Sequence, residues 1–234
     1  MTTATRPSPD AATPRRPAGS RAAGLVVSGV VLLALCVCSL AFGVRSVSIE
    51  DVLAASGGRV DTVSQAAVSA RIPRTVLAVL IGAALALSGA AMQAITRNPL
   101  ADPGILGVSG GAALAVVVGL AFFGLAAPYA LITVAIVGAA VAAVFVYAVG
   151  SLGRGGATPL KLALAGAAIS AAFASVTSAV LLPRADVMEA FRFWQIGGVG
   201  GATWDRIGIV APVLAVGALI VFLTARGMDS LALG

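Results

Sequence analysis

A run of 51 residues, 103–153, contains no Asp, Glu, Lys or Arg. As a helix it would be about 76 Å long at about 1.5 Å per residue, whereas the hydrocarbon core of a bilayer is about 30 Å thick. The run therefore predicts two membrane crossings. Pro128 is the expected break between them, because the residue before a proline is biased away from helix and Tyr129 suits the membrane interface.

Charges are kept out of four further stretches of the chain in the same way. The composition is 59% apolar and only 10% charged, with a mean hydropathy of +1.05, which is more apolar surface than one globular core could bury. The predicted fold class is therefore all-α, a polytopic bundle of membrane helices. The six expected spans are about 22–44, 75–96, 104–126, 129–152, 162–183 and 207–225.

The first 21 residues are rich in Thr, Ala, Pro and Arg and predict a disordered cytoplasmic tail, followed by a membrane domain over 22–234. A cleaved signal peptide is the alternative, but the apolar stretch 22–44 exceeds the usual hydrophobic region of about 7 to 15 residues. With the tail inside, eight Lys and Arg residues lie on the cytoplasmic side and seven outside. The basic tail is therefore the main reason to predict a cytoplasmic N-terminus.

Small residues recur at four-residue spacing in the spans, for example at Gly107, Gly111, Ala115 and Gly119. In lipid, such stripes let helix backbones approach closely, so they predict helix packing. A similar stripe includes Ser170 and Ser178, for which a pore-lining role is the alternative.

Several functional classes lack their residues in this chain. No Asp, Glu, Lys or Arg lies within a span and there is no histidine, so proton relays, His-based triads and His/Cys metal clusters cannot be assembled. The chain has no phosphate-binding loop for ATP and no basic surface interleaved with aromatic residues for nucleic acid. The sequence predicts no enzyme, no cofactor and no metal site, and any uphill transport needs a separate energy-supplying subunit.

Three sequence segments between Arg71 and Ala112 carry a family resemblance: RIPR, GAALALSGAAMQ and RNPLADPGILGVSGGA. They closely resemble the signature of the FecCD-type permeases, the membrane subunits of bacterial ABC importers for ferric siderophores, haem and cobalamin. The resemblance extends over nearly everything after Ala22. It implies an ABC ATPase subunit, a periplasmic or lipoprotein substrate-binding protein, and a second permease subunit in a homodimer or heterodimer.

Arg71 and Arg74 flank Pro73 at the expected outer end of the second span. Residues three apart lie near one face of a helix, and snorkelling arginines that anchor the helix at the membrane interface are one interpretation. The resemblance implies the other, in which these two arginines dock glutamates of the binding protein.

Two loops on the expected cytoplasmic side have prolines that interrupt helices, at Pro99 in the segment Asn98–Leu100 and at Pro159 after Thr158. A tight connection between antiparallel spans explains these residue types. The resemblance implies instead that Asn98, Pro99 and Leu100 form the cytoplasmic gate. Thr158 and Pro159 match a second gate region more loosely.

On the expected outer side, Trp194 and Trp204 flank a glycine cluster that includes Gly197 and Gly198. Tryptophans of the interfacial aromatic belt are the simpler interpretation. The whole pattern resembles the W-x-x-G-G segment that shapes the periplasmic mouth in the family.

The C-terminal residues resemble the start of the family's segment that couples the permease to the ATPase, implying this role for Met228, Asp229, Leu231 and Leu233. Family members usually have ten spans, whereas six are expected here. We therefore expect a fragment or truncated gene product that inserts into the membrane, binds an ATPase poorly and supports no uptake alone.

The function that the sequence predicts is a permease subunit, multi-pass in the bacterial inner membrane and in contact with its lipid, for uptake of a ferric siderophore. Cobalamin and haem remain alternative substrates, because the binding protein sets much of the specificity. A passive six-span channel and a structural membrane subunit without transport are alternatives of other classes.

Overall fold

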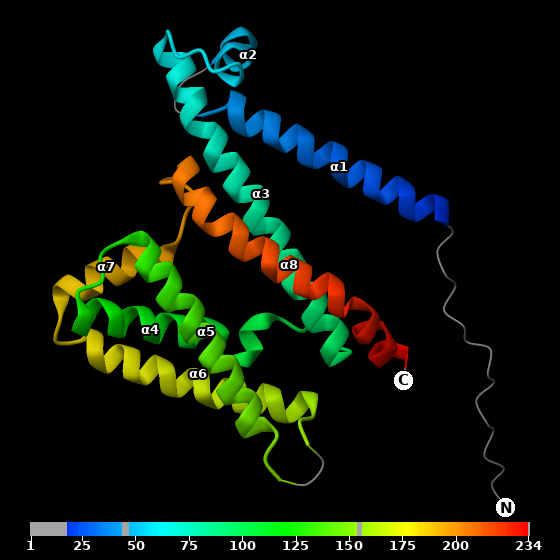
Figure 1. The fold of residues 1–234 in the computed structure, drawn as a ribbon, viewed down its shortest axis with the longest axis vertical. Helices are drawn as coiled ribbons and strands as arrows, with labels where there is room; N and C mark the ends of the chain where they lie inside the picture. The colour runs from blue at the N-terminus through cyan, green and yellow to red at the C-terminus, as the bar shows by residue number, and fades with distance from the viewer. Residues whose placement is uncertain (1–17, 44–46, 154–155, 234) are drawn as a thin grey trace, which may run out of the picture. The chain divides into compact units, whose positions relative to one another are not determined.

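A computed structural model describes residues 18–43, 47–153 and 156–233, and within these ranges the regular secondary structure is helical. The predicted all-α fold class is confirmed. The chain divides into two compact units, 1–75 and 76–234, with the boundary inside one helix. The helices are α1 (Ala18–Ala41), α2 (Ile49–Ser56), α3 (Val63–Thr96), the 3-10 helix η1 (Pro103–Leu106), α4 (Val108–Phe123), α5 (Pro128–Gly150), α6 (Pro159–Leu181), α7 (Ala185–Ile196) and α8 (Trp204–Leu233), as labelled in Figure 1.

The first unit contains α1, the short α2 and the start of α3. The most apolar part of α1 is unburied, as expected for a helix that faces lipid. The sequence did not predict α2, which begins with a capping box. The Ser48 hydroxyl accepts a hydrogen bond from the Asp51 N–H at 3.1 Å, and the Asp51 carboxylate accepts one from the Ser48 N–H at 3.4 Å. The proposed tail falls mostly on residues 1–17, which lie outside the described ranges.

Five described helices, α1, α3, α5, α6 and α8, are long and apolar enough to cross a membrane. The third predicted span, 104–126, is shorter than expected, because α4 has 16 residues and is about 24 Å long. Gly107 and Gly124, with φ of 69° and 60°, bound α4 in the left-handed region that favours glycine. Before α4, the Asp102 carboxylate caps η1 by accepting from the Gly104 N–H at 2.7 Å.

Two other boundaries differ from the predicted spans by more than a few residues. α3 begins at Val63, twelve residues before the predicted start at 75, so that Pro73 lies inside the helix and is buried. α8 continues to Leu233, beyond the predicted end at 225. By contrast, the predicted break at Pro128 is confirmed, since this proline is the first residue of α5, where its missing N–H leaves no hydrogen bond unmade.

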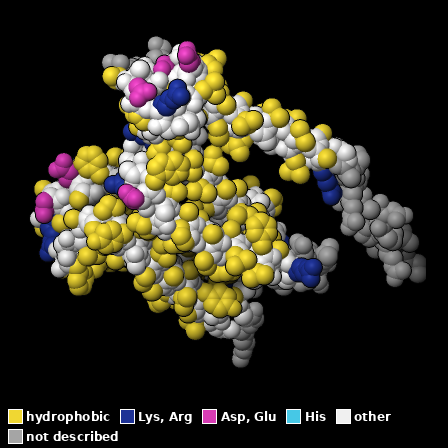
Figure 2. Space-filling model, turned by 45° about the horizontal axis from the view of Figure 1, so that its top comes forward, with side chains coloured by type: hydrophobic (Ala, Val, Ile, Leu, Met, Phe, Trp, Pro, Cys, Tyr) yellow, Lys and Arg dark blue, Asp and Glu magenta, His cyan; other side chains and the backbone are white. Residues whose placement is uncertain are grey.

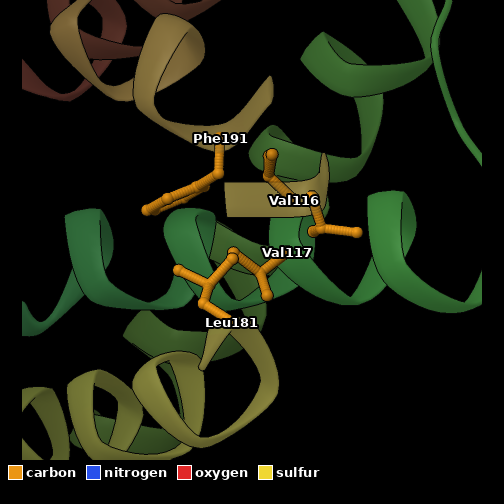
Figure 3. Packing of buried hydrophobic residues seen from close by; sticks show 5 residues of the cluster. Val116, Val117, Leu181 and Phe191 are labelled. Atoms are coloured by element: carbon orange, nitrogen blue, oxygen red, sulfur yellow. The ribbon is translucent and has the colours of Figure 1, made fainter. Parts of the chain in front are cut away.

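α4 is the central helix of the second unit, in contact with α5, α6 and α7 (Figure 1). Val116 and Val117 are fully buried, with Leu181 of α6 and Phe191 of α7 on either side of them (Figure 3). This protein environment can replace lipid around a helix too short to cross the bilayer alone. Apolar side chains cover much of the visible surface in Figure 2, as expected for membrane helices.

A second, smaller apolar cluster joins the part of α3 in this unit to the start of α8. Its buried members are Leu77, Ala202 and Ile207. The residues before α8 are therefore held against α3 through side chains.

The α4–α5 contact depends on two glycines at the crossing of the helices. A Cβ added at Gly111 would lie 2.6 Å from the Gly138 carbonyl oxygen, and one at Gly138 would lie 2.6 Å from the Gly111 carbonyl oxygen. Ala115 and Ala142 complete this small-residue crossing. Since no hydrophobic force joins helices in lipid, such close backbone approach supplies the packing contacts instead.

We expect Gly138→Ala to destabilise the second unit by about 1–3 kcal/mol, because the added methyl meets backbone atoms that cannot move aside. Gly217→Ala in α8 is the matched control, since a Cβ there has nothing within 4 Å. Thermal unfolding of the detergent-solubilised protein measures both effects. Equal melting temperatures for the two variants would contradict the close crossing.

Candidate functional site

The arginine pair Arg71 and Arg74 lies in the first unit, and its two members have different surroundings. Arg71 is partly buried, and its Nη1 donates to the carbonyl oxygens of Leu40 at 2.9 Å and Ala41 at 3.4 Å, at the end of α1. Arg74, one turn further along α3, is exposed. The sequence predicted two arginines near one face of a helix, and both belong to α3. The structure adds that the Arg71 guanidinium binds the end of α1, whereas the Arg74 side chain is exposed.

The segment Asn98–Leu100 forms a turn fixed by its own side chains. The Asn98 carboxamide oxygen accepts from the Leu100 N–H at 3.0 Å. The Leu100 side chain is 85% exposed. Arg97, just before the turn, has a φ of 51°, a conformation that is uncommon for residues other than glycine. The turn therefore presents an apolar side chain on a constrained backbone.

Thr158 and Pro159 begin α6 in the manner of a capped helix. The Thr158 hydroxyl accepts from the Lys161 N–H at 3.3 Å, and Pro159 occupies the first turn. In the described ranges, the hydrogen bonds of the Asn98 and Thr158 side chains stay within their own turns. The structure thus accounts for both loops locally, and these bonds do not join them.

The two tryptophans of the expected outer mouth differ in burial. Trp194 on α7 is partly buried and stacks on Phe191, with ring centroids 5.7 Å apart. Trp204 begins α8 and is 59% exposed. Gly197 ends α7 with a φ of 66°, and Gly198 has a φ of 147°, so both need the freedom of glycine in the reversal between the helices.

The expected coupling residues Met228, Asp229, Leu231 and Leu233 lie in the last turns of α8. Their side chains are outside the described part of the structure, so only this helical backbone bears on them. The backbone runs from the last predicted span into the segment without a break.

Sequence reasoning missed the role of Arg184, which lies just before α7. Its Nη1 donates to the Ala121 carbonyl oxygen near the end of α4, and its guanidinium carbon is 4.7 Å from the centroid of the Phe122 ring. A single arginine directly after an apolar span was the only signal in the sequence. It fits the interface of the membrane but does not specify which helix end the side chain binds.

Comparison with known proteins places this architecture among membrane permeases. The chain is 40% identical over 213 residues to the ferric enterobactin transport system permease protein FepD of Escherichia coli K12, covering 90% of this chain and 63% of that protein. It is 43% identical over 164 residues to the iron(3+)-hydroxamate import system permease protein FhuB of Bacillus subtilis 168, covering 70% and 42% respectively. Other relatives are named for import of Fe(3+)-citrate and of cobalamin and for transport of hemin.

The fold also matches a solved structure, an inward-facing conformation of a metal-chelate type ABC transporter, with a TM-score of 0.74 and 27% identity. That match covers 91% of this chain and 65% of the other, so this chain spans less than two thirds of these relatives. The FecCD transport family matches residues 31–234. The chain therefore belongs to the FecCD transport family.

Proposed function

We propose that this chain is a permease subunit, or part of one, of an ABC importer that takes up a ferric siderophore across the bacterial inner membrane. The observation that carries the proposal is the family match over residues 31–234. The uncharged spans support it, because they offer no Asp, Glu, Lys, Arg or His in the membrane through which a proton gradient could drive transport. Energy would come from a separate ABC ATPase.

The proposed complex contains a second permease subunit, ATPases on the cytoplasmic side and a binding protein outside. The outer part of α3, with Arg71 and Arg74, is the docking site for carboxylates of the binding protein. Charges at such a rim guide encounter and alignment. The last turns of α8, from Met228 on, contact the ATPase.

The turn at Asn98–Leu100 is the proposed cytoplasmic gate, with Thr158 and Pro159 in a second gate region. The exposed Leu100 supports this role, because an apolar constriction can close a path by excluding water. A turn fixed by the Asn98 hydrogen bond would move as a unit. On the opposite side, Trp194, Gly197, Gly198 and Trp204 shape the mouth of the path.

Uptake into proteoliposomes tests the proposed transport. A permease containing this chain, reconstituted with its ATPase and binding protein, should accumulate a labelled ferric siderophore in the presence of ATP, and an ATPase-dead complex is the control. Cobalamin and haem, tested in parallel, are the alternative substrates. Accumulation that is the same with and without ATP would favour the passive channel, and no accumulation of any substrate would favour the structural subunit.

The proposed topology places both the N-terminus and the α5–α6 loop in the cytoplasm and the loop before α3 outside. We expect a cysteine at Asp61 to react with a membrane-impermeant maleimide from outside, and a cysteine at Leu152, which is 71% exposed, to react only after permeabilisation. Cys36 and Cys38 are first replaced by alanine. The reverse labelling pattern would show an inverted topology.

A further inference from the structure

We infer that Arg184 is a positioning residue that holds α7 on the end of α4 and thereby sets the place of Trp194. The contact with α4 stands on the geometry of the second unit. The consequence for transport rests on the proposed function, in which Trp194 helps to shape the outer mouth of the path.

The backbone of Arg184 joins two helices. Its N–H donates to the Leu181 carbonyl at 3.0 Å, at the end of α6, and its carbonyl accepts from the Met188 N–H at 3.0 Å, in the first turn of α7. Arg184 is therefore the corner residue between α6 and α7. A contact of its side chain with a third element fixes the point from which α7 starts.

That third element is the C-terminal end of α4. The last carbonyl groups of a helix have no intrahelical N–H partner and carry the negative end of the helix dipole. The Ala121 carbonyl belongs to this last turn and accepts from Arg184 Nη1. The guanidinium carbon also lies 4.7 Å from the centroid of the Phe122 ring, within the range of a cation–π contact. One partly buried side chain thus binds both a carbonyl and a ring at the same helix end.

The remaining contact of α7 with α4 is a narrow apolar stripe. Val187 and Phe191, one turn apart, are the buried residues of α7, and they share a cluster with Val116 and Val117. Figure 3 shows the Phe191 ring beside these two valines. α7 has only 12 residues, and among the described residues no side-chain hydrogen bond caps its start. Because so short a helix is marginal by itself, its position depends on these few contacts.

The other end of α7 is a glycine reversal without close packing. Gly197 and Gly198 have φ of 66° and 147°, and a Cβ added at either would have nothing within 4 Å. Beyond them, Ala202 is buried in the separate cluster that contains Leu77 of α3. The two sides of the reversal therefore belong to different clusters. The anchor at the start of α7, rather than its link to α8, then decides where Trp194 lies.

An arginine at the end of a span can also act only as an anchor in the membrane interface, with its guanidinium among the lipid headgroups. The Arg184 side chain is instead partly buried and bound to Ala121 and Phe122 of α4. The two roles predict different results. Loss of an interfacial anchor leaves α7 as it is, whereas loss of the positioning residue loosens α7 locally.

Hydrogen–deuterium exchange of the detergent-solubilised chain, read by mass spectrometry, tests the contact without any partner. We expect Arg184→Gln to raise the exchange rate of the α7 amides about tenfold, as for the loss of a hydrogen bond made by a charged group, while the α5 amides exchange as in the wild type. Arg184→Lys keeps a cation and a donor and should stay within about threefold of the wild type. Arg192→Gln, which removes an exposed arginine from α7 itself, is the matched control and should change nothing.

An unchanged exchange rate of α7 in Arg184→Gln, or a rise shared equally by α5, would overturn the positioning role. An equal rise in Arg192→Gln or in Arg184→Lys would overturn it as well. If Arg184→Gln does not insert, Phe122→Leu takes its place, since it removes the ring and leaves every charge. It should raise the exchange of α7 about twofold, and no rise would overturn the role.

The coupling ratio of the reconstituted importer tests the consequence for transport. Arg184→Gln should lower the number of labelled ferric siderophore molecules taken up per ATP hydrolysed by about threefold or more, because a displaced mouth misaligns the path, and Arg184→Lys should restore the ratio. A wild-type ratio in Arg184→Gln would overturn this consequence. If the wild-type complex takes up no siderophore, the proposed function and this consequence fail together, whereas the exchange experiment still judges the contact.

Discussion

The structure depends on one constraint of the bilayer, which is that apolar surfaces gain nothing by leaving lipid for one another. Helices must therefore be held together by close van der Waals contact and hydrogen bonds. At the α4–α5 crossing, Gly111 and Gly138 have no Cβ, and each lies so close to the other's carbonyl that a methyl group would not fit. On the same helix α4, Val116 and Val117 are buried in a cluster with Leu181 of α6 and Phe191 of α7.

A second kind of contact recurs at the ends of helices, where carbonyl groups need hydrogen-bond donors. Arg71 donates to the end of α1 and Arg184 donates to the end of α4, and in both cases the arginine comes from a different helix or its cap. In each case a single charged side chain satisfies the carbonyls and also holds two elements together. Arginines at the margins of spans thus have a structural use in addition to any part in topology or docking.

The sequence was sufficient for features that depend on composition and on proline. The uncharged run 103–153 and Pro128 predicted two helices with their break at the correct residue, because lipid leaves few alternatives. It was insufficient for α2 and α7, which are short and mix charged with apolar residues, so that capping and packing rather than hydropathy define them. α4 is short because Gly107 and Gly124 bound it in the left-handed region, which hydropathy does not report.

The surroundings of the candidate residues were likewise predictable only in part from the sequence. The motif drew attention to Arg71, but the hydrogen bonds of its side chain to Leu40 and Ala41 depend on where α1 ends and could not be predicted from spacing. The local bonds of Asn98 and Thr158 are typical of the turn residues expected there. Their proposed part in gating concerns motion within a larger complex.

The central proposal is that this chain is part of a permease that works with a binding protein outside and an ABC ATPase inside. The rate of ATP hydrolysis by the reconstituted complex tests it most directly, with substrate-loaded binding protein added only to the opposite side of the membrane. The account predicts that the loaded binding protein accelerates hydrolysis. A rate that does not change, in a complex that demonstrably binds both partners, would contradict it.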